Sequence, residues 1–238
     1  MTPRSRLAAG AAVACAVLPA VLALAGCGAL GKLGGSAHYP AAKSFTISSR
    51  VTTLVIDGGS GSVDVTGANR STVRVSEQAL YSTKPPVPRQ VLNGTTLTLS
   101  YGCATELSCS ISYTIQVPRD VAVRASAGAG AITLTSLAGA ATAQTSSGLI
   151  TAVNLGSAEV SLKSDAGGII ATCSAAPRSL DASTKVGAIA LTMPGSVAYK
   201  ISTHTFVGTS TITVRNSARS AYAINASSDV GSISISPA

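Results

Sequence analysis

The sequence predicts an all-β protein, a single-domain parallel β-helix (a solenoid) with turns of roughly 20 residues, following a cleaved signal peptide. Three observations predict this fold. Short segments alternate apolar and polar residues and are rich in Val, Ile and Thr, which is typical of half-buried strands. No helical periodicity is recognisable after residue 43. A Gly-x-Ile or Gly-x-Val step recurs along the chain at a nearly constant spacing.

Residues 1–26 have the features of a bacterial lipoprotein signal peptide. Two arginines precede an uncharged run at 7–24, and the chain continues as Ala-Gly-Cys to Cys27. A basic start, an apolar stretch and small residues at the cleavage site mark a secretory signal. The residues around Cys27 resemble a lipobox, so we expect cleavage between Gly26 and Cys27 and fatty acylation of Cys27. The alternative is an uncleaved membrane anchor, since about 18 apolar residues can span a bilayer. Pro19 and the many small residues argue against it.

Residues 27–43 are expected to form a lipidated, flexible tether, because Gly, Ala, Leu, Ser and Pro dominate their composition. The folded domain is then expected to span residues 44–238. Export and lipidation together predict a protein anchored to the cell membrane and facing the extracytoplasmic side.

The first strands are expected where apolar and polar residues alternate, at 53–57, 62–66, 72–76 and 95–100. Residues 76–125 interrupt the repeat with a proline-rich loop, and we expect longer, irregular turns of the same domain there.

The cysteines of the folded part are expected to have different roles. Cys103 and Cys109 enclose five residues in a compartment that permits disulfides, so we expect them to pair. Cys173 is the odd cysteine, and we expect a small, half-buried residue rather than a reactive thiol.

The regular repeat occupies the C-terminal half. The β-branched residues that open its strands lie 18, 20, 19, 23 and 21 residues apart, at positions 132, 150, 170, 189, 212 and 233. In most turns a second apolar pair follows ten and twelve residues later. One turn therefore contains two short strands. A single turn cannot bury its apolar side, so the turns must stack on one another.

Stacking brings equivalent residues to about 4.8 Å from each other along parallel ladders. The first inward ladder is predicted to contain Ile132, Ile150, Ile170, Ile189, Ile212 and Ile233. A second inward wall is predicted to contain Val160, Leu180, Tyr199 and Tyr222. The preference of parallel crossovers predicts a right-handed coil. The alternative is a β-sandwich in which the spacing is coincidental.

The composition restricts the function. Charged residues make up 11% of the chain, with nine acidic residues and two histidines. Catalytic acids, bases and metal ligands come largely from these types, so we expect no enzyme, no metal site and no cofactor. The aromatic content of 3% argues against nucleic-acid modules that stack on bases. Without residues 1–26 the chain has 15 Lys and Arg and 9 Asp and Glu, and this net charge of +6 would favour anionic lipid head groups or anionic wall polymers, although it also simply keeps a polar surface soluble.

Several polar motifs have structural interpretations. The glycines at 58–61 lack the following Gly-Lys-Ser/Thr and helix of a phosphate loop, so they predict a corner. Asp165 and Asp229 are predicted to cap corners, and His204 to lie at the surface. An outward ladder is predicted for Thr133, Thr151, Thr213 and Ser234, interrupted by alanines. Such ladders can bind ice or crystalline polymers, but ordinary solvated strand positions explain this one as well.

The run Gly58–Val65, the step Ile115–Arg119 and the later Gly-x-Ile turns resemble the bacterial putative-adhesin family of β-helical envelope proteins. The resemblance covers roughly residues 45–238. It implies a β-helix at the cell surface and supplies no catalytic residues.

These expectations combine into one function, a lipid-anchored, non-enzymatic, adhesin-like binding module of the cell envelope. Its candidate partners are the membrane that holds the anchor, anionic wall polymers, lipid head groups, and surface peptides or proteins, but not nucleic acid. Two alternatives stay open: a carbohydrate-active enzyme on a β-helix scaffold, and a purely structural envelope protein.

The lipobox makes a first prediction. Replacing Cys27 by Ala removes the thiol that carries the lipid, so lipidation should be abolished and precursor or released protein should accumulate. Fractionation and intact mass measure both effects. A Cys27→Ala protein that stays in the membrane with the same acyl mass would contradict the lipoprotein interpretation.

Overall fold

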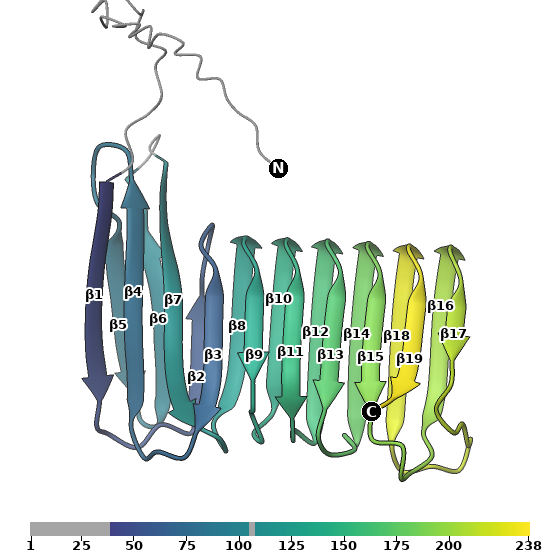
Figure 1. Ribbon diagram of the computed structural model, residues 1–238. Coiled ribbons are helices and arrows are strands. Elements are labelled where there is room, and N and C mark those ends of the chain that lie inside the picture. Colours follow the sequence, from purple (N-terminus) through teal and green to yellow (C-terminus); the bar gives the residue numbers. More distant parts are fainter. Residues whose placement is uncertain (1–38, 105–107) are drawn as a thin grey trace, which may run out of the picture. The chain divides into compact units, whose positions relative to one another are not determined.

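A computed structural model describes residues 39–104 and 108–238, and these residues form strands and turns without a helix. Nineteen strands in these ranges build two facing sheets with a common hydrophobic core (Figure 1). The predicted signal peptide, with Gly26 and Cys27, and most of the predicted tether lie outside the described residues. Within the described ranges, no helix is long and apolar enough to cross a membrane.

The two sheets are mostly parallel, and each takes one strand from every regular turn. The ten-stranded sheet has the spatial order β1 (Tyr39–Ile47), β4 (Val73–Tyr81), β7 (Cys109–Pro118), β3 (Val63–Ala68), β9 (Ile132–Thr135), β11 (Ile150–Leu155), β13 (Ile169–Cys173), β15 (Ile189–Met193), β19 (Ile233–Pro237) and β17 (Ser210–Ile212). The nine-stranded sheet has the order β16 (Lys200–Val207), β18 (Ala223–Val230), β14 (Ser179–Val186), β12 (Glu159–Ala166), β10 (Ala141–Ser147), β8 (Ala122–Ala129), β2 (Thr53–Asp57), β6 (Thr96–Gly102) and β5 (Val87–Asn93).

Each regular turn runs through one strand of the nine-stranded sheet, a corner, one strand of the ten-stranded sheet and a second corner (Figure 1). We call the first corner the upper edge and the second the lower edge, as they appear in Figure 1. The upper edge consists of residues 58–62, 130–131, 148–149, 167–168, 187–188, 208–209 and 231–232. The lower edge consists of residues 48–52, 69–72, 119–121, 136–140, 156–158, 174–178, 194–199 and 213–222.

The predicted parallel solenoid is confirmed between β8 and β15. In the ten-stranded sheet Ile132 lies opposite Ile150, Ile150 opposite Ile169, and Ile169 opposite Ile189. These partners are 18, 19 and 20 residues apart in the sequence. All four side chains are at most 1% exposed, so they form one continuous wall of the core.

The inward ladder differs from the prediction at two positions. Ile169 faces the core, whereas Ile170 is 44% exposed, because the register places the residue after Gly168 inside. Ile212 lies opposite Ile235 and is 37% exposed, because β17 is the last strand of its sheet and no further turn covers it. The same register of β17 places Thr211, and not Thr213, opposite Ser234.

The second inward wall also differs. Val160 and Leu180 are buried partners as predicted, and Ile224 continues their ladder. Tyr199 and Tyr222 instead lie at the lower edge, with ring centroids 6.2 Å apart. Each tyrosine directly precedes its strand. The second residue of each predicted pair, two positions later, occupies the place in the ladder that was predicted for the tyrosine.

At its C-terminal end the solenoid is not stacked in sequence order. The last turn, β18 and β19, is inserted between the turn of β14 and β15 and the turn of β16 and β17 (Figure 1). The C-terminal strands therefore have neighbours on both sides, and an earlier segment forms the exposed end.

The N-terminal end has the same kind of insertion. The first turn, β2 and β3, lies between the turn of β6 and β7 and the turn of β8 and β9. Residues 76–125 are not irregular turns, as we expected, but mostly long strands. β1, β4 and β7 pair antiparallel, and so do β5 and β6. β1 includes the last five residues of the predicted tether, because they pair with β4.

The inward assignment predicts a large difference between two neighbouring substitutions. Ile189→Asp would place an unpaired carboxylate in the core and should cost about 4 kcal/mol or more. Ala190→Asp faces outward from the same strand and should cost less than about 1 kcal/mol. Denaturant unfolding of both variants measures the difference, and equal midpoints would refute the assignment.

Candidate functional site

The site residues expected from the sequence have different outcomes. Gly26 and Cys27 lie outside the described residues, so the predicted cleavage and lipidation stay predictions. Cys103 and Cys109 form a disulfide that joins the end of β6 to the start of β7. His204 packs against Phe206 at the exposed end, and Asp165 does not cap a corner but pairs with Lys185 at 3.1 Å. The described residues contain no group of three His, Cys, Asp or Glu side chains that could hold a metal ion.

Cys173 is a core residue. Its side chain is 5% exposed and lies opposite Leu155 in the ten-stranded sheet. Burial raises the pKa of its thiol to about 11, so the thiol is protonated at neutral pH. Cys173 therefore has the small, unreactive character expected from the sequence, with more burial than expected.

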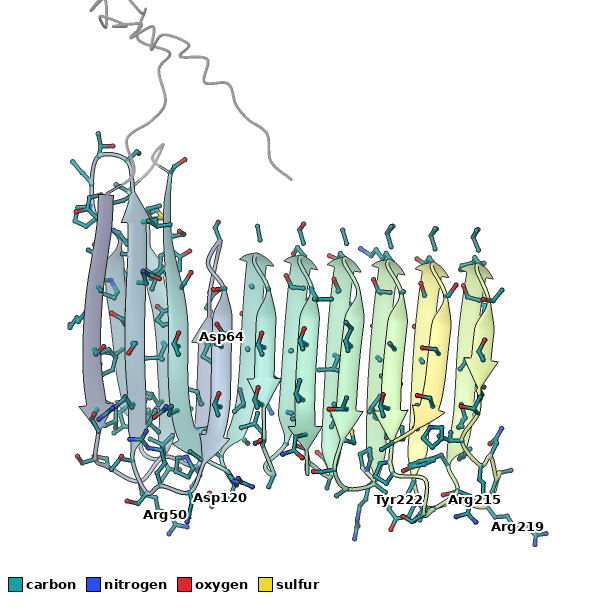
Figure 2. All side chains as sticks on the ribbon, viewed as in Figure 1. Arg50, Asp64, Asp120, Arg215, Arg219 and Tyr222 are labelled. Carbon is teal, nitrogen blue, oxygen red and sulfur yellow. A yellow bond between two sulfur atoms is a disulfide. The ribbon has the colours of Figure 1, made fainter. Side chains whose placement is uncertain are left out.

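The strongest charge feature of the surface is a row of arginines along the lower edge, several of which are labelled in Figure 2. We call this row the arginine edge; it consists of Arg50, Arg70, Arg119, Arg178, Arg215 and Arg219. All six lie on lower-edge loops. Five of them lie where the chain leaves the ten-stranded sheet and enters the nine-stranded sheet, and Arg70 lies in the loop that connects β3 to β4 within the ten-stranded sheet. The repeat thus places arginines that are far apart in the sequence along one edge of the protein.

Two of these guanidinium groups are held by the protein. Arg70 is half-buried and donates to Gln116 Oε1 at 2.5 Å and to Thr72 Oγ1 at 3.0 Å. Arg215 donates to the backbone carbonyls of Ser196 and Gly195. These bonds fix the direction of both side chains.

The other four arginines, which we call the free arginines, are exposed, and their guanidinium groups make no hydrogen bond or ion pair with the described residues. They are Arg50, Arg119, Arg178 and Arg219. Asp120 is the acidic residue of the lower edge in the described ranges (Figure 2). The lower edge therefore has an uncompensated positive charge that can pair with anions from outside.

A shallow polar groove adjoins this edge on the outer face of the nine-stranded sheet. Its volume is about 420 Å³, and it crosses the first halves of β8, β10, β12 and β14. Its polar lining comprises Thr53, Arg124, Thr142, Glu159, Ser161, Ser179 and Asp181. Short hydroxyl side chains leave the space open, while charged groups stand at its sides.

The polar groups of the groove are oriented by neighbouring turns. Asp181 accepts a hydrogen bond from Ser179 Oγ at 3.1 Å and from Asn225 Nδ2 at 2.7 Å. Arg178, one of the free arginines, directly precedes Ser179. The groove and the arginine edge therefore form one continuous surface, which we call the lower surface.

Sequence reasoning recognised the positive charge but not its location. Their position in the sequence could have indicated this location, because the free arginines all lie in the short segments that separate two alternating runs. Assigning those segments to one edge requires the strand order, which the stacking of the turns decides.

A second polar feature lies inside the N-terminal end. Glu77 on β4 faces inward and is 6% exposed, yet it makes no hydrogen bond or ion pair with the described residues. It lines a cavity of about 140 Å³ together with Lys43 and the prolines of the loop before β5. Opposite Glu77 lies Tyr113, whose buried hydroxyl has no hydrogen-bond partner among the described residues. Burial raises the pKa of Glu77, and the positive charge of Lys43 partly opposes this.

Comparison with known proteins gives structural neighbours of low similarity. A putative cell adhesion protein from Clostridium sporogenes has 16% identity and a TM-score of 0.49, over 84% of this chain and 100% of its own. A putative adhesin from Bacteroides fragilis has 12% identity and a TM-score of 0.37, over 84% and 97% of the two chains. A putative lipid binding protein from Parabacteroides distasonis has 11% identity and a TM-score of 0.36, over 84% and 96%. No family model and no curated protein matches the chain. The function is therefore argued from the surface of this chain.

The buried carboxyl group predicts a pH dependence of stability. Because the pKa of Glu77 is higher in the folded than in the unfolded state, the folded state binds the proton more tightly. Its contribution to stability is full below the ordinary pKa near 4.5 and is lost as the pH rises through the raised value. Glu77→Gln keeps a neutral side chain at every pH, so it should be more stable than the wild type at pH 7.

Unfolding midpoints at pH 4 and pH 7 measure this effect. The advantage of Glu77→Gln should shrink or vanish at pH 4. A larger advantage at pH 4 than at pH 7 would contradict the raised pKa.

Proposed function

We propose that this protein is a lipid-anchored, extracytoplasmic β-helix that acts as a non-enzymatic, adhesin-like binding module of the cell envelope. Its lower surface binds an anionic polymer whose units also carry hydroxyl groups. The observation that carries the proposal is the row of free arginines beside a polar groove.

Arginine is suited to such a ligand. Its planar guanidinium group donates two parallel hydrogen bonds to a phosphate or a carboxylate, and it stays charged at every physiological pH. The free arginines have no competing carboxylate partner in the described residues, so binding an anion breaks no ion pair. Contacts to several anionic groups of one polymer add together, because the first contact raises the effective concentration of the others.

The groove supports the hydroxyl-bearing part of the ligand. Thr142, Ser161 and Asp181 extend outward from three neighbouring strands and can exchange hydrogen bonds with sugar or polyol hydroxyl groups. These side chains stand on adjacent parallel strands, about 4.8 Å apart. A rigid sheet holds them in place before the ligand arrives, which lowers the entropic cost of binding.

One observation favours a carbohydrate-active enzyme as a second candidate. Glu159 and Asp181 both line the groove, with Arg124 across from them. Two carboxylates in one groove are the minimum for acid–base cleavage of a glycosidic bond. Polymer shortened on incubation with the wild type but not with Glu159→Gln or Asp181→Asn would support the enzyme instead of the binding module.

The binding proposal predicts that location, not total charge, decides affinity. We would compare one variant with Gln at the four free arginines against a matched variant with Gln at Arg74, Lys84, Arg89 and Lys163. Both variants lose four exposed positive charges. The probes are poly(glycerol phosphate) and polygalacturonate, with dextran as the uncharged control.

Each exposed charge pair contributes about 0.2–1 kcal/mol, so four pairs at about 0.7 kcal/mol each should change the affinity by about 100-fold. The edge variant should lose this factor and much of its salt dependence, whereas the matched variant should stay within about threefold of the wild type. Equal losses in both variants would show that only net charge matters. Unchanged binding by the edge variant, or equal binding of dextran, would refute the proposed site.

A further inference from the structure

The upper edge has the opposite character to the arginine edge, because large apolar side chains are exposed along it. Phe206 is 74% exposed, Val207 62%, Val186 55%, Val230 46% and Leu149 42%. We call these five residues the apolar ridge. They are among the most exposed large apolar side chains of the described residues, and all of them lie at or next to the same corner.

The ridge is continuous because the turns are in register. Val186 lies opposite Val230, and Val230 lies opposite Val207 on the outermost strand of the nine-stranded sheet. Phe206 precedes Val207, and its ring is held edge-on by His204, with centroids 4.7 Å apart. Lys185, which directly precedes Val186, is paired with Asp165 at 3.1 Å. The ridge is thus an apolar line without a free positive charge beside it.

The N-terminal end also has exposed apolar side chains near its upper end. Leu80 near the end of β4 is 41% exposed, and Val87 at the start of β5 is 62% exposed. β7 begins four residues above Tyr113, which lies opposite the first residue of β3, so this end is about 13 Å taller. Seven strand spacings, about 34 Å, separate β7 from β17. A flat surface tilted by about 20° relative to the row of upper-edge corners therefore contacts both the N-terminal end and the outer end of the ridge.

The chain reaches the domain from this same side. β1 begins at Tyr39 at its upper end and runs down toward the lower edge (Figure 1). Eleven residues, 28–38, connect Tyr39 to Cys27, and the flexible tether predicted from their composition would span about 20 Å on average. β1 is nine residues long, so the arginine edge lies about 30 Å from Tyr39.

We infer that the upper edge rests on the lipid bilayer, with Phe206 and the valines of the apolar ridge in the interfacial region. The inference rests on the lipid anchor of the proposed function, because the anchor brings this edge to the membrane. Apolar side chains that enter the interfacial region add to the attachment that the lipid anchor provides. Each large side chain that leaves water on insertion adds to it. In this orientation the arginine edge points away from the bilayer, toward polymers further out.

Fluorescence can test the contact because the chain contains no tryptophan. Phe206→Trp places a single reporter on the ridge, and Ala218→Trp places one on an exposed loop of the lower edge. The full lipidated protein is reconstituted into vesicles of phosphatidylcholine and phosphatidylglycerol, with and without brominated acyl chains. If the mass of the purified protein shows no acyl group at Cys27, a maleimide lipid attaches the same protein through Cys27.

The Phe206→Trp emission should shift to the blue on vesicles and lose at least half its intensity with brominated lipid. The Ala218→Trp emission should change by less than a tenth. Adding Val186→Ser and Val207→Ser to Phe206→Trp should weaken the quenching at least twofold, while the far-ultraviolet circular dichroism stays that of the parent. Equal quenching at both reporters, or none at residue 206, would overturn the inference.

A blue shift without quenching by brominated lipid would assign the ridge to contact with another protein molecule and would also overturn it. Failure of the polymer experiment leaves the quenching result intact. The acyl mass at Cys27 reports separately on the anchor, so the two proposals can fail independently.

Discussion

The close approach of successive turns at the upper edge is the constraint on which the other features depend. At Gly187 the backbone N–H donates to Val230 O at 2.9 Å, and the Gly187 carbonyl accepts from Ser228 Oγ at 2.9 Å. Gly231 of that next turn has a φ of +151°, and a Cβ added there would lie 2.0 Å from the Gly187 carbonyl oxygen. Only glycine fits this position, because a side chain would separate the turns and break both bonds. The same hydroxyl-to-glycine bond recurs from Thr145, Ser164, Thr184 and Thr205.

This corner explains how a core with so few aromatic residues is sealed. The buried hydroxyl groups close the upper end of the core without leaving unpaired polar atoms, and aliphatic ladders fill the space below them. Because the parallel strands of successive turns pair in register, outward residues form straight rows. The groove and the ridge are both products of this regularity.

The inserted turns give the solenoid protected ends. A chain stacked in sequence order would end in a terminal strand with one free edge, which can fray or pair with another chain. Here the first and last turns each have neighbours on both sides. Of the outermost strands, β5, β16 and β17 belong to segments that continue into the fold at both of their ends, and β1 pairs with β4 along its whole length. The two long edges can then be specialised, and they differ sharply: the lower edge collects unpaired arginines, while the upper edge collects exposed apolar side chains.

The sequence by itself determined most strands of the regular repeat, the approximate length of the turn, the glycine corners and the Cys103–Cys109 pair, because these depend on local alternation and short spacing. It could not decide between Ile169 and Ile170 as the inward residue, since adjacent apolar residues satisfy the alternation equally well. It also could not decide the order of the turns. Near-identical repeats form equivalent ladders in several orders, so long-range packing makes the choice. The candidate sites depend on that choice: a corner becomes a charged or an apolar edge only when many turns are aligned, and no single segment contains that information.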